Sequence, residues 1–455
     1  MKKLSVLLVA AIMVLALTMP AAAFENEFGG YWRTRFYTDM GFSGTENSKY
    51  NTRDINVTDT RTRLFYTAKF SDNLKFVNKF EVNANWGGNK SYGQLGADAT
   101  SDTNYFRVKN SYVDFKLAQQ RFTVGVQDFL LGRGYIFNDD AAGIKAMFKV
   151  NDSIYLPLIY MKMYEGGAGY DSKSNSNSNY DMAAWVFYPS LFLNKDNVFK
   201  PHISYIVSED GSQAKAKNNL VVYDYPNGSS VPARDVSVWS AGLEYDGKFD
   251  IYDFGATGIF QFGNIKLLTG DDSNASGYLF DLFGGVNLGP SNIHAKGIYA
   301  SGKKYDNTSN DMKQFFTIGP TTDWGTSYYW AEIMGAGIID NQVPSGAPGD
   351  KISNVWIGNL GASYKLIQDL KLSADLWYAI RAEDVKIATA PGASQAHSAS
   401  LGTELDLVAT YTIVDNLKLD LIGAYLWAGD AITKSVDPYG STNPIELAAQ
   451  LSLAF

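Results

Sequence analysis

The sequence predicts an all-β protein, a transmembrane antiparallel β-barrel of about 18 strands (roughly 16–20), which forms one domain over residues 24–455. Three observations lead to this fold class. The final stretch, Ile445–Phe455, alternates apolar residues with small or polar ones at a period of two and ends on an aromatic residue. Strand-like segments follow one another along the chain without a convincing amphipathic helix. Their connections alternate between very short and long, which is typical of a barrel that crosses a membrane.

Residues 1–23 have the pattern of a secretory signal peptide. Two lysines near the start precede the apolar run Leu4–Leu17, and Ala21–Ala23 offers small residues for cleavage. The mature chain is therefore expected to begin near Phe24. No later run of about 18 apolar residues is present, so we do not expect a membrane-spanning helix. A soluble periplasmic or secreted protein stays open at this point.

Composition favours a membrane barrel over the soluble alternative. Aromatic residues make up 14% of the chain and include 29 tyrosines, whose rings favour membrane–water interfaces. The formal net charge of −8 argues against nucleic acid as a partner. The absence of cysteine excludes disulfides and thiolate metal sites.

The strands follow in order from the alternation of residue types and from the turn residues between them. Asp, Asn and Gly at short connections such as Asp72-Asn73, Gly289-Pro290 and Asp415-Asn416 favour tight turns. An even strand number places both chain ends in the periplasm, with short turns facing the periplasm and long loops facing outside. Strands are predicted at 28–38, 60–70, 74–86, 105–117, 121–129, 142–150, 153–164, 180–189, 198–208, 236–246, 250–263, 277–288, 292–302, 353–366, 370–381, 401–413, 417–428 and 445–455.

The longest connection, residues 303–352, does not reveal its path in the sequence. Within it, Trp330–Ile339 is compatible with a strand, a helix or a loop folded inward. Whether the whole connection folds into the lumen is therefore left open.

Alternate positions of the strands suit lipid on one side and a water-filled lumen on the other. Strand 417–428, for example, presents Leu419, Leu421, Tyr425 and Trp427 on one face. Aromatic residues recur near strand ends, as expected for interfacial girdles.

The inward positions separate by charge. The early strands carry a basic set, the later strands carry an acidic set, and neighbouring strands should gather each set into an arc of the lumen wall. Such charges set pore selectivity, although pairing across strands that only braces the wall is an equal alternative for any one residue. The basic arc comprises Arg33, Arg35, Arg61, Arg63, Lys75, Lys79, Arg107, Lys109 and Lys145. The acidic arc comprises Glu244, Asp253, Asp281, Asp375, Glu404 and Asp406.

Within the basic arc, the four arginines form a cluster on two neighbouring strands. Few acidic residues are expected nearby to neutralise it, which favours a role in attracting anions.

Signals for catalysis are poor. The chain has three histidines, His202, His294 and His397. No two of them have metal-ligand spacing, and His202 with Ser204 lacks an orienting acid and an oxyanion motif. We therefore predict no catalytic residues, no metal site and no cofactor.

Several motifs resemble known barrel families. The segments Tyr105–Phe115 and Phe122–Gln127 resemble the strand pair of porins and alginate-export-type barrels, and Asp139–Lys145 resembles the strand start that follows. Val126 departs from this pattern, because those families carry a basic residue there. Phe315–Gly337 resembles an alginate-export loop but lacks its histidine. The resemblance implies a channel of about 18 strands for anionic or sugar-like solutes.

The terminal Phe455 resembles the closing residue of bacterial outer-membrane barrels. This resemblance implies that Phe455 is an assembly signal and that the barrel assembly machinery is a partner.

Together these observations favour a channel in the cell outer membrane for passive diffusion of small hydrophilic solutes, with anions preferred. The first alternative is a dedicated exporter of an anionic polysaccharide of the alginate-export type. A barrel enzyme and a structural or adhesive barrel with a blocked lumen are further alternatives. A plugged transporter is disfavoured because the first strand begins within about ten residues of the cleavage site. The solute, the transport direction, the gating and the oligomeric state stay open at this point.

Overall fold

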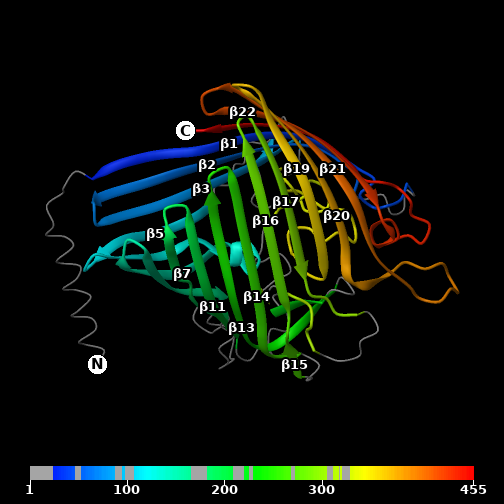
Figure 1. Ribbon diagram of the computed structural model, residues 1–455, viewed down its shortest axis with the longest axis horizontal. Coiled ribbons are helices and arrows are strands. Elements are labelled where there is room, and N and C mark those ends of the chain that lie inside the picture. The colour runs from blue at the N-terminus through cyan, green and yellow to red at the C-terminus, as the bar shows by residue number, and fades with distance from the viewer. Residues whose placement is uncertain are drawn as a thin grey trace.

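In the computed structural model the chain folds into a closed antiparallel β-barrel (Figure 1). β1 (Glu25–Met40) pairs with β2 (Ile55–Ser71) on one side and with the last strand, β23 (Ile445–Ala454), on the other. The pairing of first and last strands leaves no free edge, which confirms the closed barrel predicted from the alternating terminal stretch. The structure describes residues 24–46, 53–87, 95–97, 107–164, 182–208, 220–224, 229–267, 272–304, 311–316, 318–319 and 328–455.

The wall has 18 strand positions, as predicted. β9 and β10 count as one position because both pair with β8 and β11, and β15 and β16 count as one because both pair with β14. After β1 and β2 the wall continues through β3 (Leu74–Trp86), β5 (Arg107–Leu117), β6 (Gln120–Leu131), β7 (Phe137–Asn151), β8 (Ile154–Tyr164), β9 (Met182–Phe187) with β10 (Ser190–Asn194), β11 (Asn197–Ser208), β13 (Ser229–Phe249), β14 (Tyr252–Leu267), β15 (Asp272–Ala275) with β16 (Tyr278–Leu288), β17 (Ser291–Ala300), β19 (Val355–Ile367), β20 (Leu370–Ile387), β21 (Ala396–Val414) and β22 (Leu417–Ala428). The connections hold β4 (Leu95–Ala97), β12 (Leu220–Asp224), β18 (Ile318–Gly319), the 3-10 turn η1 (Gly132–Gly134) and the short helix α2 (Asp430–Thr433).

Eight connections at one end of the barrel, here the short-turn end, are only two residues long. Asp250, Gly289 and Asn416 adopt positive φ angles of 55°, 61° and 68° there, a backbone that Asp, Asn and Gly tolerate better than most residues. The turns are Asp72-Asn73, Ala118-Gln119, Asp152-Ser153, Lys195-Asp196, Asp250-Ile251, Gly289-Pro290, Gln368-Asp369 and Asp415-Asn416. The opposite ends of these strands, as far as the structure describes them, form the other end of the barrel, here the long-loop end.

The outer face of the wall is apolar. Large side chains such as Leu64, Leu421 and Leu447 are exposed there, and exposed Trp86 and Trp427 lie where strands reach the long-loop end. An exposed apolar belt with aromatic residues at its rim is the surface that a barrel presents to lipid. No helix within the described ranges has the length and apolar character needed to cross a membrane.

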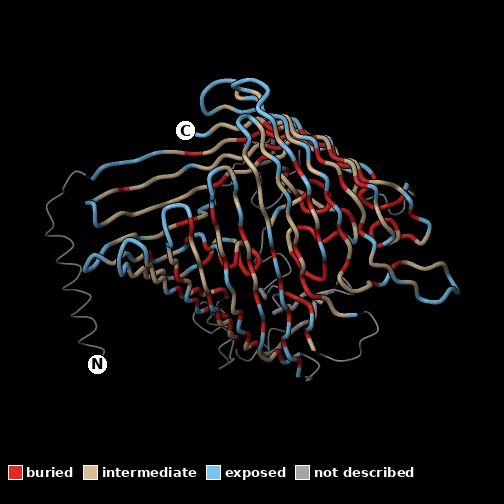
Figure 2. Tube along the Cα trace, in the orientation of Figure 1, coloured by how far each residue is buried: buried red, intermediate tan, exposed pale blue. Residues whose placement is uncertain are grey.

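Two connections from the long-loop end fold into the lumen. The constriction loop, defined here as residues 328–350, has Ala331, Ile333 and Met334 fully buried. The partition segment, residues 132–136, contains Tyr135, which is also buried. Figure 2 shows buried residues gathered where these inward segments meet the strands, whereas the hairpin tips of the short-turn end are exposed. The open question about Trp330–Ile339 is thereby answered, because this stretch is a loop folded inward.

Two features of the sequence fall outside the part of the chain that the structure describes. These are the predicted signal peptide, residues 1–23, and residues 105–106 at the start of the porin-like motif.

Candidate functional site

The constriction loop is anchored to the later strands through carboxylates of β21. Glu404 accepts hydrogen bonds from the backbone N–H groups of Ile333 and Met334 at 2.6 and 2.9 Å. Asp406 accepts one from the N–H of Glu332 at 3.1 Å. Hydrogen bonds from backbone N–H groups to carboxylates are charge-assisted and stronger than neutral ones. Two residues of the predicted acidic arc therefore hold a loop rather than line an open pore.

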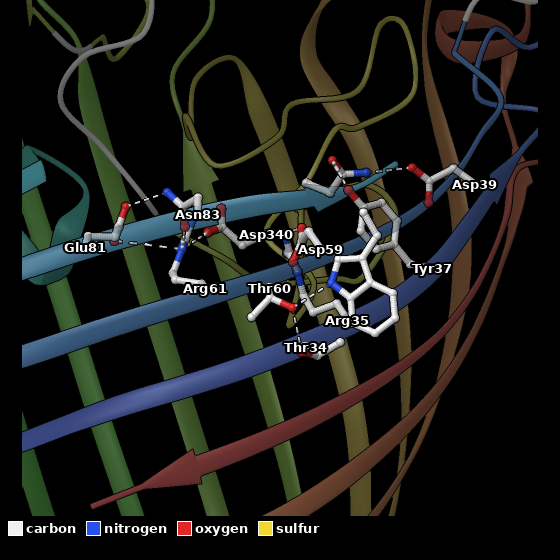
Figure 3. A network of polar contacts seen from close by, with 12 residues as sticks. Thr34, Arg35, Tyr37, Asp39, Asp59, Thr60, Arg61, Glu81, Asn83 and Asp340 are labelled. Atoms are coloured by element: carbon white, nitrogen blue, oxygen red, sulfur yellow. Dashed lines mark hydrogen bonds and ion pairs between the residues drawn. The ribbon is translucent and has the colours of Figure 1, made fainter. Parts of the chain in front are cut away.

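The far end of the constriction loop reaches the first strands of the barrel. Asp39 on β1 accepts hydrogen bonds from the side chains of Asn341 and Gln342 at 2.8 and 3.0 Å. Asp340 lies 3.8 Å from the guanidinium of Arg61 on β2. Figure 3 shows Asp340 directed at the arginines of the wall. On the inside of the barrel the loop thus bridges β21 to β1 and β2, with only β22 and β23 between β21 and β1 in the wall.

The partition segment crosses from another part of the wall. Arg133 donates hydrogen bonds to the Thr257 hydroxyl at 2.6 Å and to the Tyr245 carbonyl at 3.0 Å, and its guanidinium lies 2.7 Å from Asp246. Tyr135 stacks on Tyr328 of the constriction loop with ring centroids 4.1 Å apart. The two inward segments therefore meet and narrow the lumen together.

The four arginines of the cluster lie on the neighbouring strands β1 and β2, but only Arg33 and Arg61 are directly opposite each other. The register places Arg35 opposite Asp59 and Arg63 opposite Tyr31. Arg33 is buried, and two of its guanidinium nitrogens have no hydrogen-bond partner in the described structure. Arg35 is also buried and forms a two-point ion pair with Asp59, one contact of which is 2.9 Å long. These two arginines therefore present little charge to the lumen.

Arg61 and Arg63 are partly exposed, at 23% and 31% of their side-chain surface. Both approach Glu81 on β3, at 3.8 and 2.7 Å. Arg61 also donates to Asn83 at 2.7 Å (Figure 3). The expectation that few acidic residues lie near the arginine cluster is therefore wrong. Asp59, Glu81 and Asp340 all contact it.

The lysines of the basic arc also have partners. Lys79 lies 3.1 Å from Asp128, and Lys109 forms an ion pair with Asp140. Lys145 donates to the backbone carbonyl of Asp128. The strand register places Lys75 opposite Lys69 of β2 and opposite Asp114 of β5. It places Arg107, which is exposed, opposite Glu81.

The remaining acidic residues are spread over the opposite wall. Glu244 is buried and accepts a hydrogen bond from Tyr188. Asp281 is buried 4.0 Å from Lys296. Asp253 accepts from the Asn287 side chain at 2.5 Å. Asp375 lies 2.8 Å from His294.

We call the inward face of β1 to β7 the basic wall and that of β13 to β21 the acidic wall. On the acidic wall the carboxylates engage loops or side-chain networks.

Sequence reasoning missed the residues that complete the site. Asp59 shares its alternation with Arg61 and Arg63, so it would have been assigned inward had the predicted strand begun one residue earlier. The Gly132-Arg133-Gly134 triplet signals a special turn, since Arg133 has a φ of 54° between two glycines that also have positive φ. No local signal identifies Asp340, because its partner on β2 is distant in sequence.

The carboxyl group of Glu332 in the constriction loop has a raised pKa. Burial, reinforced by the nearby carboxylate of Asp406, raises the pKa of Glu332 to about 8. The Glu332 side chain also accepts a hydrogen bond from the N–H of Ile338 at 2.8 Å. Its protonation state therefore changes close to neutral pH and bears on how firmly the loop is held.

Comparison with known proteins gives structural neighbours but no sequence relatives. No protein-family model matches the chain, and no curated protein matches it. Among solved structures, OccAB3 of Acinetobacter baumannii has a TM-score of 0.57 at 10% identity, covering 95% of this chain and 100% of that one. A BenF-like porin from Pseudomonas fluorescens Pf-5 has a TM-score of 0.55 at 10% identity, covering 95% and 98%. OpdK of Pseudomonas aeruginosa, solved with vanillate, has a TM-score of 0.54 at 10% identity, covering 95% and 98%.

At this identity the likeness shows the fold, which is that of outer-membrane porins, over nearly the whole of each chain. The resemblance of the sequence motifs to porins agrees with this fold. The finer resemblance to alginate-export-type barrels finds no support among these neighbours.

Proposed function

We propose that the protein is an outer-membrane channel through which small hydrophilic solutes diffuse. The observation that supports this most is the constriction loop, which is tied inside a closed barrel but leaves charged side chains of the basic wall accessible. Arg61, Arg63 and Lys79 keep 23%, 31% and 30% of their side-chain surface exposed. A narrowed polar passage inside an apolar belt is the architecture of a diffusion channel.

We propose further that the passage favours anions, but modestly. The basic arc contains nine basic side chains, and the carboxylates that contact it in the described structure are Asp59, Glu81, Asp128, Asp140 and Asp340. Positive charge is therefore in excess. Pairing with these five carboxylates reduces the field that a passing solute meets, because opposite charges within about 4 Å largely cancel at a distance.

An exporter of anionic polysaccharide is not favoured. A polymer requires an open lumen along its whole length, whereas the constriction loop and the partition segment meet at Tyr135 and Tyr328 inside the barrel.

The channel function is tested by reconstituting the purified barrel in planar lipid bilayers. We expect stepwise ionic currents in KCl, with chloride more permeant than potassium at low salt and the preference lost near about 1 M, where the Debye length falls to about 3 Å. Protein that inserts as a folded, heat-modifiable barrel but carries no current would contradict the proposal.

A further inference from the structure

A second polar feature of the lumen lies between the inward segments and the short-turn end. A cavity of about 640 Å³, here the turn-side cavity, is lined by β6, β14, β16, β17, β19 and β20 together with residues of both inward segments. Its size falls within the range of about 300–1,000 Å³ that is typical of small-molecule sites. Two of its lining residues, Asp253 and Asn292, each lie two residues from a short turn. This edge of the cavity is therefore close to the short-turn end of the barrel.

One side of the turn-side cavity is aromatic and rigid. Trp330 and Trp377 meet edge to face with ring centroids 5.5 Å apart, and the indole N–H of Trp330 donates to the Gly349 carbonyl at 2.9 Å. Tyr328 is held by its stack on Tyr135. The indole nitrogen of Trp377, a side chain only 8% exposed, has no hydrogen-bond partner in the described structure. The aromatic side thus offers fixed ring faces, while the Trp377 N–H is buried and does not face the cavity.

The other side of the cavity carries planar polar groups in a connected network. The two ring nitrogens of His294 lie 2.9 Å from the Asn292 side-chain oxygen and 2.8 Å from Asp375. Asn359 donates to the same Asp375 oxygen at 3.1 Å. Because these contacts use one oxygen of Asp375, its second oxygen is available as an acceptor.

The charges that line the cavity balance one another. Arg133 and Lys296 contribute two positive charges, and Asp253 and Asp375 contribute two negative charges. Each cation already has a partner, since Arg133 pairs with Asp246 at 2.7 Å and Lys296 bonds Tyr328. The cavity therefore has no excess charge with which to attract an ion, in contrast to the basic wall.

We propose that the turn-side cavity is a binding subsite for a neutral, polyhydroxylated ring of the monosaccharide class. Such a ring has an apolar C–H face that packs on an aromatic side chain, and equatorial hydroxyls that both donate and accept hydrogen bonds. The two indole rings provide the apolar contact, and Asp375 and Asn359 provide the polar one. Sites lined by rings with a few fixed polar groups take their specificity from those groups. This inference rests on the proposed channel function for the solute's route into the cavity.

The test measures binding of D-glucose to the detergent-solubilised barrel by isothermal titration calorimetry. Sorbitol, an open chain of similar size, and benzoate, an aromatic anion, serve as comparison ligands. We expect glucose to bind at least tenfold more tightly than either. Benzoate binding more tightly than glucose, or glucose and sorbitol binding alike, would overturn the proposal.

Variants assign the binding to the cavity. Trp330→Ala should weaken glucose binding at least tenfold, and Trp356→Ala, which removes an exposed tryptophan from the outer face, should leave it unchanged. If Trp330→Ala fails to fold, the conservative Trp377→Phe keeps an aromatic side chain but replaces the bicyclic indole by the smaller phenyl ring, and it should still weaken binding measurably. Unchanged glucose affinity in folded Trp330→Ala and Trp377→Phe would refute the site.

Bilayer currents separate the two proposals. A conducting barrel that does not bind glucose refutes the subsite and leaves the channel standing. A barrel that binds glucose but does not conduct refutes the channel, while the cavity assignment is supported.

Discussion

The basic wall and the acidic wall differ in what their charged groups do. On the acidic wall, Glu404 and Asp406 are buried and accept hydrogen bonds from the backbone of the constriction loop. On the basic wall, Arg61 and Arg63 share Glu81 but stay partly exposed. The sign of a charge on a strand therefore does not decide whether it faces the solute. Both walls hold the constriction loop, the acidic wall through Glu404 and the basic wall through Asp39. Only on the basic wall do partly exposed guanidinium groups also face the passage that the loop leaves.

The largest effect is expected from releasing the anchor. Glu404→Ala leaves the N–H groups of Ile333 and Met334 without their acceptor, and hydrogen bonds to charged groups contribute about 1.5–3 kcal/mol each. The constriction loop should detach, and single-channel conductance should rise roughly twofold or more as the passage widens.

The matched control for this prediction is Asp420→Ala on β22. Asp420 is also acidic, but it bonds Thr410 on the neighbouring strand at 2.6 Å and does not contact the loop in the described structure. Equal conductance in both variants and the wild type would show that Glu404 is not the anchor.

The next effect concerns stability within the basic wall. Asp59→Asn breaks a buried ion pair and leaves the Arg35 charge uncompensated, which costs about 3–5 kcal/mol. Arg63→Ala breaks a partly exposed pair, which costs about 0–1 kcal/mol. Urea unfolding of the two variants in the same lipid should therefore give clearly different midpoints. Similar midpoints would mean that burial does not distinguish the two pairs.

A smaller effect is expected on selectivity. Removing both exposed guanidinium groups in Arg61→Ala/Arg63→Ala should lower the chloride-to-potassium permeability ratio roughly twofold to fourfold at low salt, on the order of 0.2–0.4 kcal/mol per charge. Glu81→Gln should raise the ratio, because it frees the same two groups from their carboxylate. Reversal potentials in a KCl gradient measure both variants, and a shift in the same direction for the two would rule out this role of Glu81.

The smallest effect is expected from pH. The folded pKa of Glu332, about 8, lies above its value of about 4.3 in an unfolded chain. Its contribution to loop stability is therefore present at low pH and is lost as the pH rises through about 8. The acidic groups that act on Glu332 are Glu404 and Asp406 on β21, Asp375 on β20 and Glu446 on β23. Current noise should increase as the pH rises from about 5 to about 8 and level off above that, and Glu332→Gln should remove that increase. An unchanged pH profile in this variant would assign the effect to another group.

The fold was largely predictable because strand alternation and turn chemistry are local. Asp415-Asn416 and Gly289-Pro290 identify their turns without reference to the rest of the chain, and the period of two identifies the strands. The pairing of β1 with β23 followed from closure alone. The paths of the inward segments were not predictable, because Glu404 recognises backbone N–H groups of Ile333 and Met334, which have no sequence signature.

The charged residues of the lumen were more predictable than the inward segments but less predictable than the strands. Their inward placement follows from alternation, but their partners depend on register. The contacts of Asp59 with Arg35 and of Glu81 with Arg63 can be predicted only when the pairing register of each hairpin is known to within one residue. Asp340 meets Arg61 only once the loop has folded inward.

The role of Phe455 in assembly stays a prediction. Its backbone exchanges hydrogen bonds with Gly30 at 2.7 and 3.1 Å, and its ring is exposed on the outer face. These contacts place the residue at the closing seam, where its deletion should lower the yield of folded barrel.

The most direct test of a passage along the basic wall compares the accessibility of single cysteines on the two walls. The chain has no cysteine, so each introduced thiol is unique. Arg63→Cys replaces a partly exposed side chain of the basic wall, and Ala379→Cys replaces a fully buried one on β20. With a cationic thiol reagent added to conducting channels, the current of Arg63→Cys should change rapidly while Ala379→Cys stays unmodified. Rapid modification of Ala379→Cys with no effect at position 63 would place the passage along the opposite wall.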